Sequence, residues 1–229
     1  MQKVLLCFLI CFCIFCIASS GYAAPCYGTR MPEGKHLFVG LQAYSVFKRS
    51  LENDYGKISS LQNFFLISYG VFDWLSIDLK GGEGNINQHP RTGAGLKYPA
   101  FVGGGYGFRA KLYDTDKTKI VFGFQHISIH SHTISAGASK NKAVLDNWQF
   151  SFLISRNFLH ITPYLGTSWS RMDNIHWLNT IRKLEQSNIG KSTGLIIGAD
   201  IPINKKSWFN LEGRFFDETS VAGSINFAF

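Results

Sequence analysis

The chain has few acidic residues and, beyond its first stretch, no long apolar run. Its 229 residues include 15 Asp and Glu against 23 Lys and Arg, which gives a formal net charge of +8. The basic residues nowhere form a run or a basic helix, so nucleic acid is a poor candidate partner. After residue 18 no apolar stretch approaches the roughly 20 residues of a membrane-spanning helix. This excludes a helical membrane protein.

The first stretch is predicted to be a signal peptide. Met1 to Lys3 supply a short positive start, and an apolar run follows from Val4 to Ala18. The small residues Gly21-Tyr22-Ala23-Ala24 then provide a cleavage site of the required kind. The run is too short for a transmembrane anchor. We therefore expect a signal peptide at 1–23 and an exported protein.

A disulfide scaffold is excluded once that segment is removed. Four of the five cysteines lie within it, and only Cys26 follows. One cysteine cannot form an intrachain bridge. Pro25 directly before Cys26, with no Leu three residues upstream, argues against a lipid-modified cysteine. We expect Cys26 to be a free thiol in a short extension.

The remainder is rich in Phe, Gly, Tyr and Trp and shows period-2 patterning bounded by turn residues, which predicts strands. No amphipathic helix competes, although 172–186 is expected to be a loop that holds a helical turn. Ten candidate strands emerge, at 36–49, 61–70, 74–81, 100–113, 119–132, 144–156, 159–171, 189–203, 207–216 and 219–229.

The alternation separates an apolar face from a polar one. In the last candidate strand the apolar face carries Val221, Gly223, Ile225, Phe227 and Phe229. Other strands place charges of both signs on the polar face. In the strand at 74–81, the apolar face carries Leu75, Ile77 and Leu79, and the polar face carries Ser76, Asp78 and Lys80. A membrane barrel turns its apolar face to lipid and its polar face to the lumen. The predicted lumen charge network is Asp78, Lys80, Arg109, Lys111, Asp200, Glu212 and Arg214.

The lengths of the connections favour a membrane barrel. Those after strands two, four, six and eight span about two to five residues, and those after strands one, three, five and seven about 11 to 18. Outer-membrane barrels alternate short periplasmic turns with long external loops in this way. We predict an all-β chain: a transmembrane antiparallel up-and-down β-barrel of about ten strands, with eight to twelve possible. Its domains would be a periplasmic extension at 24–35 and the barrel at 36–229.

Three stretches resemble small bacterial outer-membrane β-barrels. Val221-x-Gly223-x-Ile225-x-Phe227-x-Phe229 resembles the C-terminal signal that the family's barrel-assembly machinery recognises. The stretch 68–77 looks like the tyrosine-glycine turn of such barrels, and 210–219 is similar to their penultimate hairpin. The resemblance implies location in the bacterial outer membrane, with outer-membrane lipids and lipopolysaccharide as partners. Seven basic residues in or beside the predicted long loops would either bridge lipopolysaccharide phosphates or be solvated without a partner: Lys140, Lys142, Arg91, Lys97, Arg171, Arg182 and Lys183.

One stretch invites an enzymatic interpretation. His126, Ser128, His130 and His132 share a face at strand spacing. His126-x-Ser128 resembles the catalytic strand of outer-membrane lipid A deacylases. Those enzymes have Asn after the Ser, where this chain has Ile129, and a Glu about a dozen residues on, where the first acid here is Asp146. The alternative catalytic set is therefore His126, Ser128 and Asp146, in a lipid A acyl-ester hydrolase.

Other interpretations are weaker. A metal site at His130 and His132 lacks a nearby Asp, Glu or Cys. The acidic and Asp-His motifs of omptin-type proteases are absent, and no motif indicates a cofactor. The sequence thus favours a non-enzymatic barrel that acts as a membrane scaffold, surface-loop display protein or narrow pore, with histidines 126–132 in a polar lumen. A soluble secreted β-sandwich binding protein is the third alternative.

Overall fold

The computed structural model describes residues 28–136 and 139–229. The predictions for the signal peptide at 1–23 and for Cys26 therefore lie outside the described residues. In the described part, one antiparallel sheet closes on itself through pairing of its first and last strands. No helix among these residues is long and apolar enough to cross a membrane.

Ten strands form the wall, and each pairs with the next along the chain before β14 returns to β1. This confirms the all-β fold and the count of ten. The sandwich alternative is wrong, because a sheet that closes has no second sheet to pack on. The wall strands are β1 (Leu37–Ser50), β2 (Lys57–Phe72), β3 (Leu75–Gly84), β6 (Gly103–Asp114), β7 (Thr118–His130), β9 (Ser139–Arg156), β10 (Thr162–Leu178), β12 (Thr193–Pro202), β13 (Ser207–Phe215) and β14 (Glu218–Ala228).

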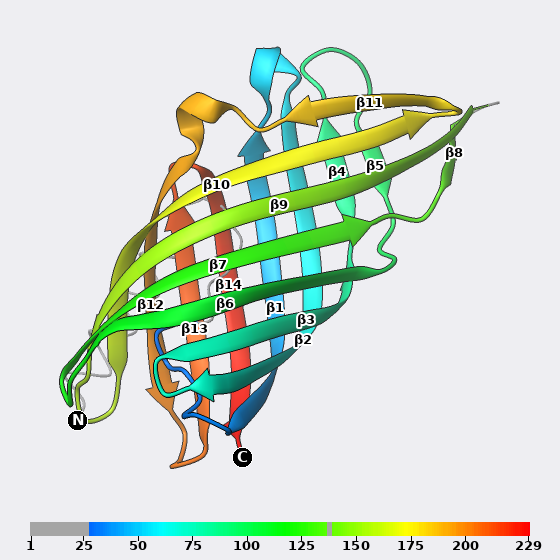
Figure 1. Ribbon diagram of the computed structural model, residues 1–229. Coiled ribbons are helices and arrows are strands. Elements are labelled where there is room, and N and C mark those ends of the chain that lie inside the picture. Colours follow the sequence, from blue (N-terminus) through cyan, green and yellow to red (C-terminus); the bar gives the residue numbers. More distant parts are fainter. Residues whose placement is uncertain (1–27, 137–138) are drawn as a thin grey trace, which may run out of the picture.

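The two ends of the barrel differ (Figure 1). Brief turns at 73–74, 115–117, 157–161 and 203–206 lie at one end, here called the short-turn end. The other, the long-loop end, carries the connections β1–β2, β3–β6, β7–β9, β10–β12 and β13–β14. Those connections hold the smaller elements β4 (Ile86–His89), β5 (Leu96–Tyr98), β8 (Ile134–Ala136), β11 (Ile181–Gln186) and the 3-10 helices η1 (Glu52–Asp54) and η2 (Ile189–Lys191).

The helical turn predicted within 172–186 is wrong. Strand β10 continues to Leu178, and β11 pairs with it as a hairpin that sets Trp177 opposite Arg182 and Ile175 opposite Leu184. The long strand β9 accompanies β10 along this extension, with Asn141 opposite Leu178. Apolar spacing in so short a segment fits either period, and pairing with β9 decides it. Likewise β2 begins at Lys57, four residues before its predicted start.

The interior is filled in two different ways. Towards the short-turn end it is polar, as the buried Asp78, Arg109 and Glu212 illustrate. Towards the long-loop end it is an apolar cluster that includes residues of the loop strands β4 and β5. That cluster comprises Tyr44, Val46, Leu51, Ile58, Phe64, Leu66, Ile86, Tyr98, Ile127, Ile129, Ala143, Leu145, Met172 and Ala222.

The segment before β1 folds into the barrel. Residues 28–36, here called the strap, include the described part of the extension predicted at 24–35. Thr29 is buried, and the Arg109 side chain on the inner wall donates to the Arg30 carbonyl at 2.8 Å. At the rim, Lys35 N–H donates to the Gly70 carbonyl. The described part of the extension thus occupies the short-turn end of the lumen.

Candidate functional site

The alternative catalytic residues lie on the outer wall, on the neighbouring strands β7 and β9. Register places Ser128 opposite Asp146 and His126 opposite Trp148. The His126 ring packs against Trp148, with centroids 4.1 Å apart, and against Tyr106 at 5.2 Å. His126 Nε2 lies 3.3 Å from Asp146 Oδ1. Two of the three residues, His126 and Asp146, are therefore brought into contact.

The serine is bound to a different histidine. Ser128 Oγ lies 3.3 Å from His130 Nε2, within hydrogen-bond distance. A serine nucleophile needs one imidazole that contacts both its hydroxyl and the carboxylate. Here Ser128 contacts His130, whereas Asp146 contacts His126. The described geometry thus separates Ser128 from the other two members of the catalytic set.

The prediction that these histidines and Ser128 serve a polar lumen is wrong. In β7 the inward residues at this height are Ile127 and Ile129, both buried in the apolar cluster. The lumen changes from polar to apolar along the strand, so polarity no longer marks the inward face. Further along, His132 lies outside β7, where its ring packs against Phe101 with centroids 4.2 Å apart.

Six of the seven residues predicted for the lumen network are buried on the inner wall. Arg109 binds Asp78 with two hydrogen bonds, Nε to Oδ2 at 2.8 Å and Nη2 to Oδ1 at 3.0 Å. Lys80 Nζ donates to Gln125 Oε1 at 3.1 Å. Such buried charges are tolerated when they are paired and hydrogen-bonded.

The same half of the lumen holds a second polar group around β12 and β13. Asp200 Oδ1 accepts from Asn210 Nδ2 at 2.8 Å, and Glu212 Oε2 accepts from the Tyr164 hydroxyl at 2.9 Å. Arg214 Nε lies 3.9 Å from Glu212 Oε1. The seventh predicted residue, Lys111, is placed elsewhere. It lies beside the β6–β7 turn, where its Nζ pairs with Asp114 Oδ2 at 2.9 Å.

A buried arginine cluster at the long-loop end was missed by the sequence reasoning. Arg49 Nη1 lies 3.0 Å from Glu218 Oε2 and 3.4 Å from Asp217 Oδ2. Its guanidinium also donates to Ser170 and Ser187. Arg49 and Glu218 are paired in register across the β1–β14 seam, where the sheet closes. The one signal was the very short connection Asp217-Glu218, whose acids turn inward to this arginine.

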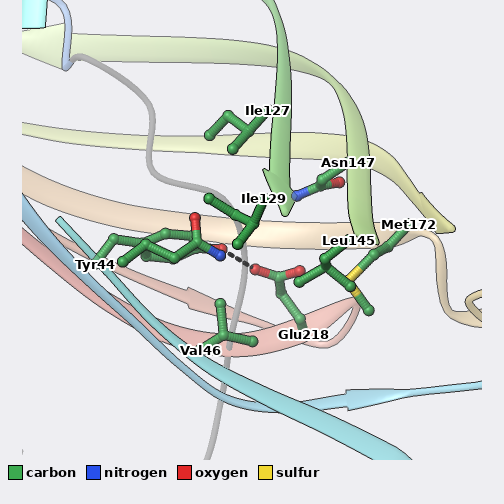
Figure 2. A pocket seen from close by; sticks show the side chains of 9 residues that line it. Tyr44, Val46, Ile127, Ile129, Leu145, Asn147, Met172 and Glu218 are labelled. Carbon is green, nitrogen blue, oxygen red and sulfur yellow. Dashed lines mark hydrogen bonds between the residues drawn. The ribbon is translucent and has the colours of Figure 1, made fainter. Parts of the chain in front are cut away.

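A small cavity lies in the apolar half of the lumen (Figure 2). Its walls are mostly apolar, and its void of about 10 Å³ holds roughly one water. The Tyr44 hydroxyl donates to Glu218 beside it. Gln62 Oε1 and Asn147 Oδ1 also line it and lack hydrogen-bond partners among the described atoms. The cavity is suited to a bridging water and is too small for a larger solute.

Above the apolar cluster, polar residues join two long connections. Glu185 Oε2 in β11 accepts from Gln88 Nε2 in β4 at 2.7 Å and from Asn174 Nδ2 in β10 at 3.2 Å. His176 Nδ1 lies 3.8 Å from the same oxygen. Burial lowers the pKa of His176 from its ordinary value of 6.5, Glu185 opposes that shift, and Lys183 adds to it. This contact ties the β4–β5 hairpin to the part of β10 and β11 that projects beyond the barrel.

Acid is expected to weaken the contact that Glu185 and His176 make between the β4–β5 hairpin and β10–β11. Because the pKa of His176 is lowered by folding, its contribution to stability is complete above pH 6.5 and is lost as the pH falls through the folded value. Proteolysis at 179–192 should therefore be faster at pH 5 than at pH 8. The His176→Gln variant should flatten this pH dependence, and a variant as pH-sensitive as the wild type would contradict the assignment.

No cluster suited to a metal ion is present in 28–136 or 139–229, where no group of three His, Cys, Asp or Glu residues converges. The predicted option at His130 and His132 gains no further ligand there. Each of these two histidines instead contacts another side chain, Ser128 and Phe101 respectively.

No protein-family profile matches the sequence, and no curated protein matches it. Among solved structures, the chain is similar to the outer membrane protease OmpT from Escherichia coli, with 8% identity over 88% of this chain and 99% of that one and a TM-score of 0.47. An outer membrane channel from Pseudomonas putida F1 gives 8% identity over 90% and 100%, with a TM-score of 0.46. The β domain of the Bordetella autotransporter BrkA gives 10% identity over 86% and 100%, with a TM-score of 0.45. These structural neighbours are outer-membrane β-barrels. The likeness is one of architecture alone.

Proposed function

We propose that this chain is a non-enzymatic protein of the bacterial outer membrane, a scaffold that spans the bilayer with a filled lumen and displays its long-loop end outside the cell. The observation that carries the proposal is an apolar exterior around a polar and packed interior. Soluble monomers rarely expose contiguous apolar patches beyond a few hundred Å². Large apolar side chains face outward around the wall, among them Leu41, Ile67, Ile77, Phe108, Phe152, Leu165, Ile197, Leu211 and Phe227.

The filled lumen favours a scaffold over a pore. The apolar cluster and the Arg49 cluster occupy the long-loop half, and the strap occupies the short-turn end. A barrel of ten strands encloses an interior near the size that side chains fill. Surface display fits the long connections, which carry four additional strands.

The lipid partner is proposed from the outer face of the projecting hairpins. Lys142 Nζ lies 4.5 Å from the centre of the Trp177 ring, and Arg182 stands opposite Trp177 on β11. Leu184 and Ile181 are exposed on the same strand. Cations beside exposed apolar side chains suit an anionic lipid surface. We propose that lipopolysaccharide phosphates lie here.

Membrane location is tested by expression with native export, followed by fractionation and gel migration with and without boiling. We expect the protein in the outer-membrane fraction, with faster migration of the unboiled sample because a closed barrel resists SDS. Recovery in the soluble periplasmic fraction would overturn the proposal.

Assembly supplies a second expectation. Phe229 is largely exposed at the end of the closing strand, and its N–H donates to the Leu37 carbonyl at 2.9 Å. If the terminal residues form the recognition signal, Phe229→Asp should leave export intact and reduce insertion severalfold. The matched control Leu159→Asp changes an exposed residue of the β9–β10 turn. Normal insertion of Phe229→Asp, measured in the outer-membrane fraction, would refute the signal.

A lipid A acyl-ester hydrolase is the second candidate function. What favours it is the outward position of His126, Ser128 and Asp146, where an acyl chain in the bilayer can reach them. This function requires the Ser128 hydroxyl to leave its contact with His130 and to form a hydrogen bond with His126 instead. Deacylation of purified lipid A that is lost in Ser128→Ala and retained in His130→Gln would establish it. We expect no deacylation by the wild type, because the two pairs are separate.

A further inference from the structure

We propose that the short-turn half of the lumen is a binding site for an extended peptide, that the strap is its occupant, and that the strap can leave and return. The inner wall contacts the strap mainly through its backbone. Arg109, whose guanidinium is held by Asp78, directs Nη1 to the Arg30 carbonyl at 2.8 Å and to the Gly28 carbonyl at 3.5 Å. One fixed cation therefore holds two carbonyls of an extended segment.

Gly28 packs against the inner wall beside Asp200 and Asn210. Its φ is +71°, in the left-handed region that a β-branched side chain avoids. A Cβ there would lie 2.8 Å from Asn210 Nδ2 and 2.8 Å from Asp200 Oδ1. Those two atoms are already bonded to each other within the buried wall. The site thus accepts glycine at this position and rejects larger residues.

Arg30 supplies the side-chain contact. Its guanidinium lies 4.3 Å from the centre of the Trp208 ring, a cation–π arrangement, and Nη2 donates to the Lys205 carbonyl at 3.3 Å. Trp208 is itself buried against Phe38, with ring centroids 5.0 Å apart. Gly28 and Arg30 therefore contact different parts of the wall: Gly28 lies beside Asp200 and Asn210, and Arg30 binds Trp208 and Lys205.

The rim of the barrel is shaped to let the strap pass. A Cβ on Gly70 would lie 2.0 Å from the Glu33 carbonyl oxygen, so the strap backbone crosses directly over this glycine. Gly70 N–H donates to the His36 carbonyl, and Gly34 N–H donates to Asp73 Oδ1 at 2.8 Å. This gives Gly70, near the end of β2, a role in holding the strap.

The nature of these contacts makes the strap separable from the wall. They include hydrogen bonds from side chains to backbone carbonyls, hydrogen bonds from the Thr29 and Gly34 N–H groups to Asp200 and Asp73, and one ring contact. The apolar cluster that seals the other half of the lumen contains no strap residue. Departure of the strap would open the polar half to the short-turn side and leave the long-loop side closed. The ligand class is an extended peptide with glycine two residues before arginine.

The test uses the full chain and a fluorescein-labelled synthetic peptide of residues 28–36. The Gly28→Val chain weakens its own strap while keeping Arg109, Asp200 and Trp208 intact. Peptide binding, followed by anisotropy in detergent, should be at least tenfold tighter to this chain than to the wild type, whose site is filled. A Gly28→Val peptide is the matched control, and it should bind the same chain at least tenfold more weakly.

Gly70→Ala provides a second chain, since it displaces the strap from the rim, and it is tested with a peptide of residues 28–31 that ends before the segment crossing Gly70. Unboiled gel migration establishes that each chain is folded. Equal binding to wild-type and variant chains, or equal binding of the two peptides, would overturn the proposal. Failure of both variants to fold would also overturn it, because the strap would then be an integral part of the barrel.

Discussion

Replacement of Arg49 by methionine is expected to destabilise the folded barrel by about 3–5 kcal/mol, the cost of breaking a buried ion pair from one side. The guanidinium is 1% exposed and contacts Asp217, Glu218 and two serines. Without it, Asp217 and Glu218 remain buried and lose the cation that pairs with both. Because the cluster lies at the β1–β14 seam, the loss acts on the closure of the sheet.

The measurement is urea unfolding of the refolded protein in detergent, together with the temperature at which the unboiled gel band disappears. The triple variant Arg49→Met, Asp217→Asn, Glu218→Gln removes the stranded charges and should recover most of the stability. Arg49→Lys keeps the charge without the forked donors and should fall between the two. Wild-type stability in Arg49→Met alone would show that the cluster does not hold the seam.

The fold was predictable from the sequence because, over most of their length, the wall strands alternate apolar residues that face outward with polar residues that face inward. In β3, Ile77 and Leu79 face outward while Ser76 and Asp78 are buried, as alternation indicates. Turn residues then mark the strand ends, and the number of alternating segments between them gives the count. All ten wall strands were found for this reason.

The site was less predictable, because the rule reverses near the long-loop end. Ile127 and Ile129 face inward there and pack on residues from the β4–β5 hairpin, so His126 and Ser128 face outward. A single strand cannot reveal this, since the apolar filling comes from loops distant in sequence. Arg49 was missed for a related reason: a bulge after Val46 shifts its register, and its partners lie about 170 residues away.

The strap was missed because its contacts are local in space and remote in sequence. Gly28 and Arg30 carry no periodic signal, and their partners lie on β6, β12 and β13. Arg109 binds backbone carbonyls of the strap, and every residue type has such a carbonyl, so the strap sequence shows no pattern that predicts the contact. Only the structure explains the two glycines: Gly28 has a positive φ, and the strap backbone crosses over Gly70.

A charged substitution on the apolar exterior tests most directly whether the outer face of the barrel contacts lipid hydrocarbon. Leu211→Arg is expected to cost about 2–4 kcal/mol in a lipid bilayer, the range for an arginine on the lipid face of a barrel near the midplane. Leu211 faces outward in β13, 36% exposed, opposite Gly223 of β14 and Ala199 of β12. In a water-soluble barrel the same change would place a cation in water at little cost.

Leu159→Arg is the matched control, since it makes the same substitution at an exposed residue of the β9–β10 turn. Asn210→Arg would not serve, because Asn210 is buried and donates to Asp200 and Tyr164, so that an arginine there would overfill the lumen. Folding into lipid vesicles, measured by urea titration, should separate Leu211→Arg from both wild type and Leu159→Arg. In detergent micelles the difference should shrink, because micelles deform around a charge more readily than a bilayer. Equal stability of Leu211→Arg and Leu159→Arg in vesicles would mean that this face does not contact hydrocarbon, and the membrane proposal would lose the observation that carries it.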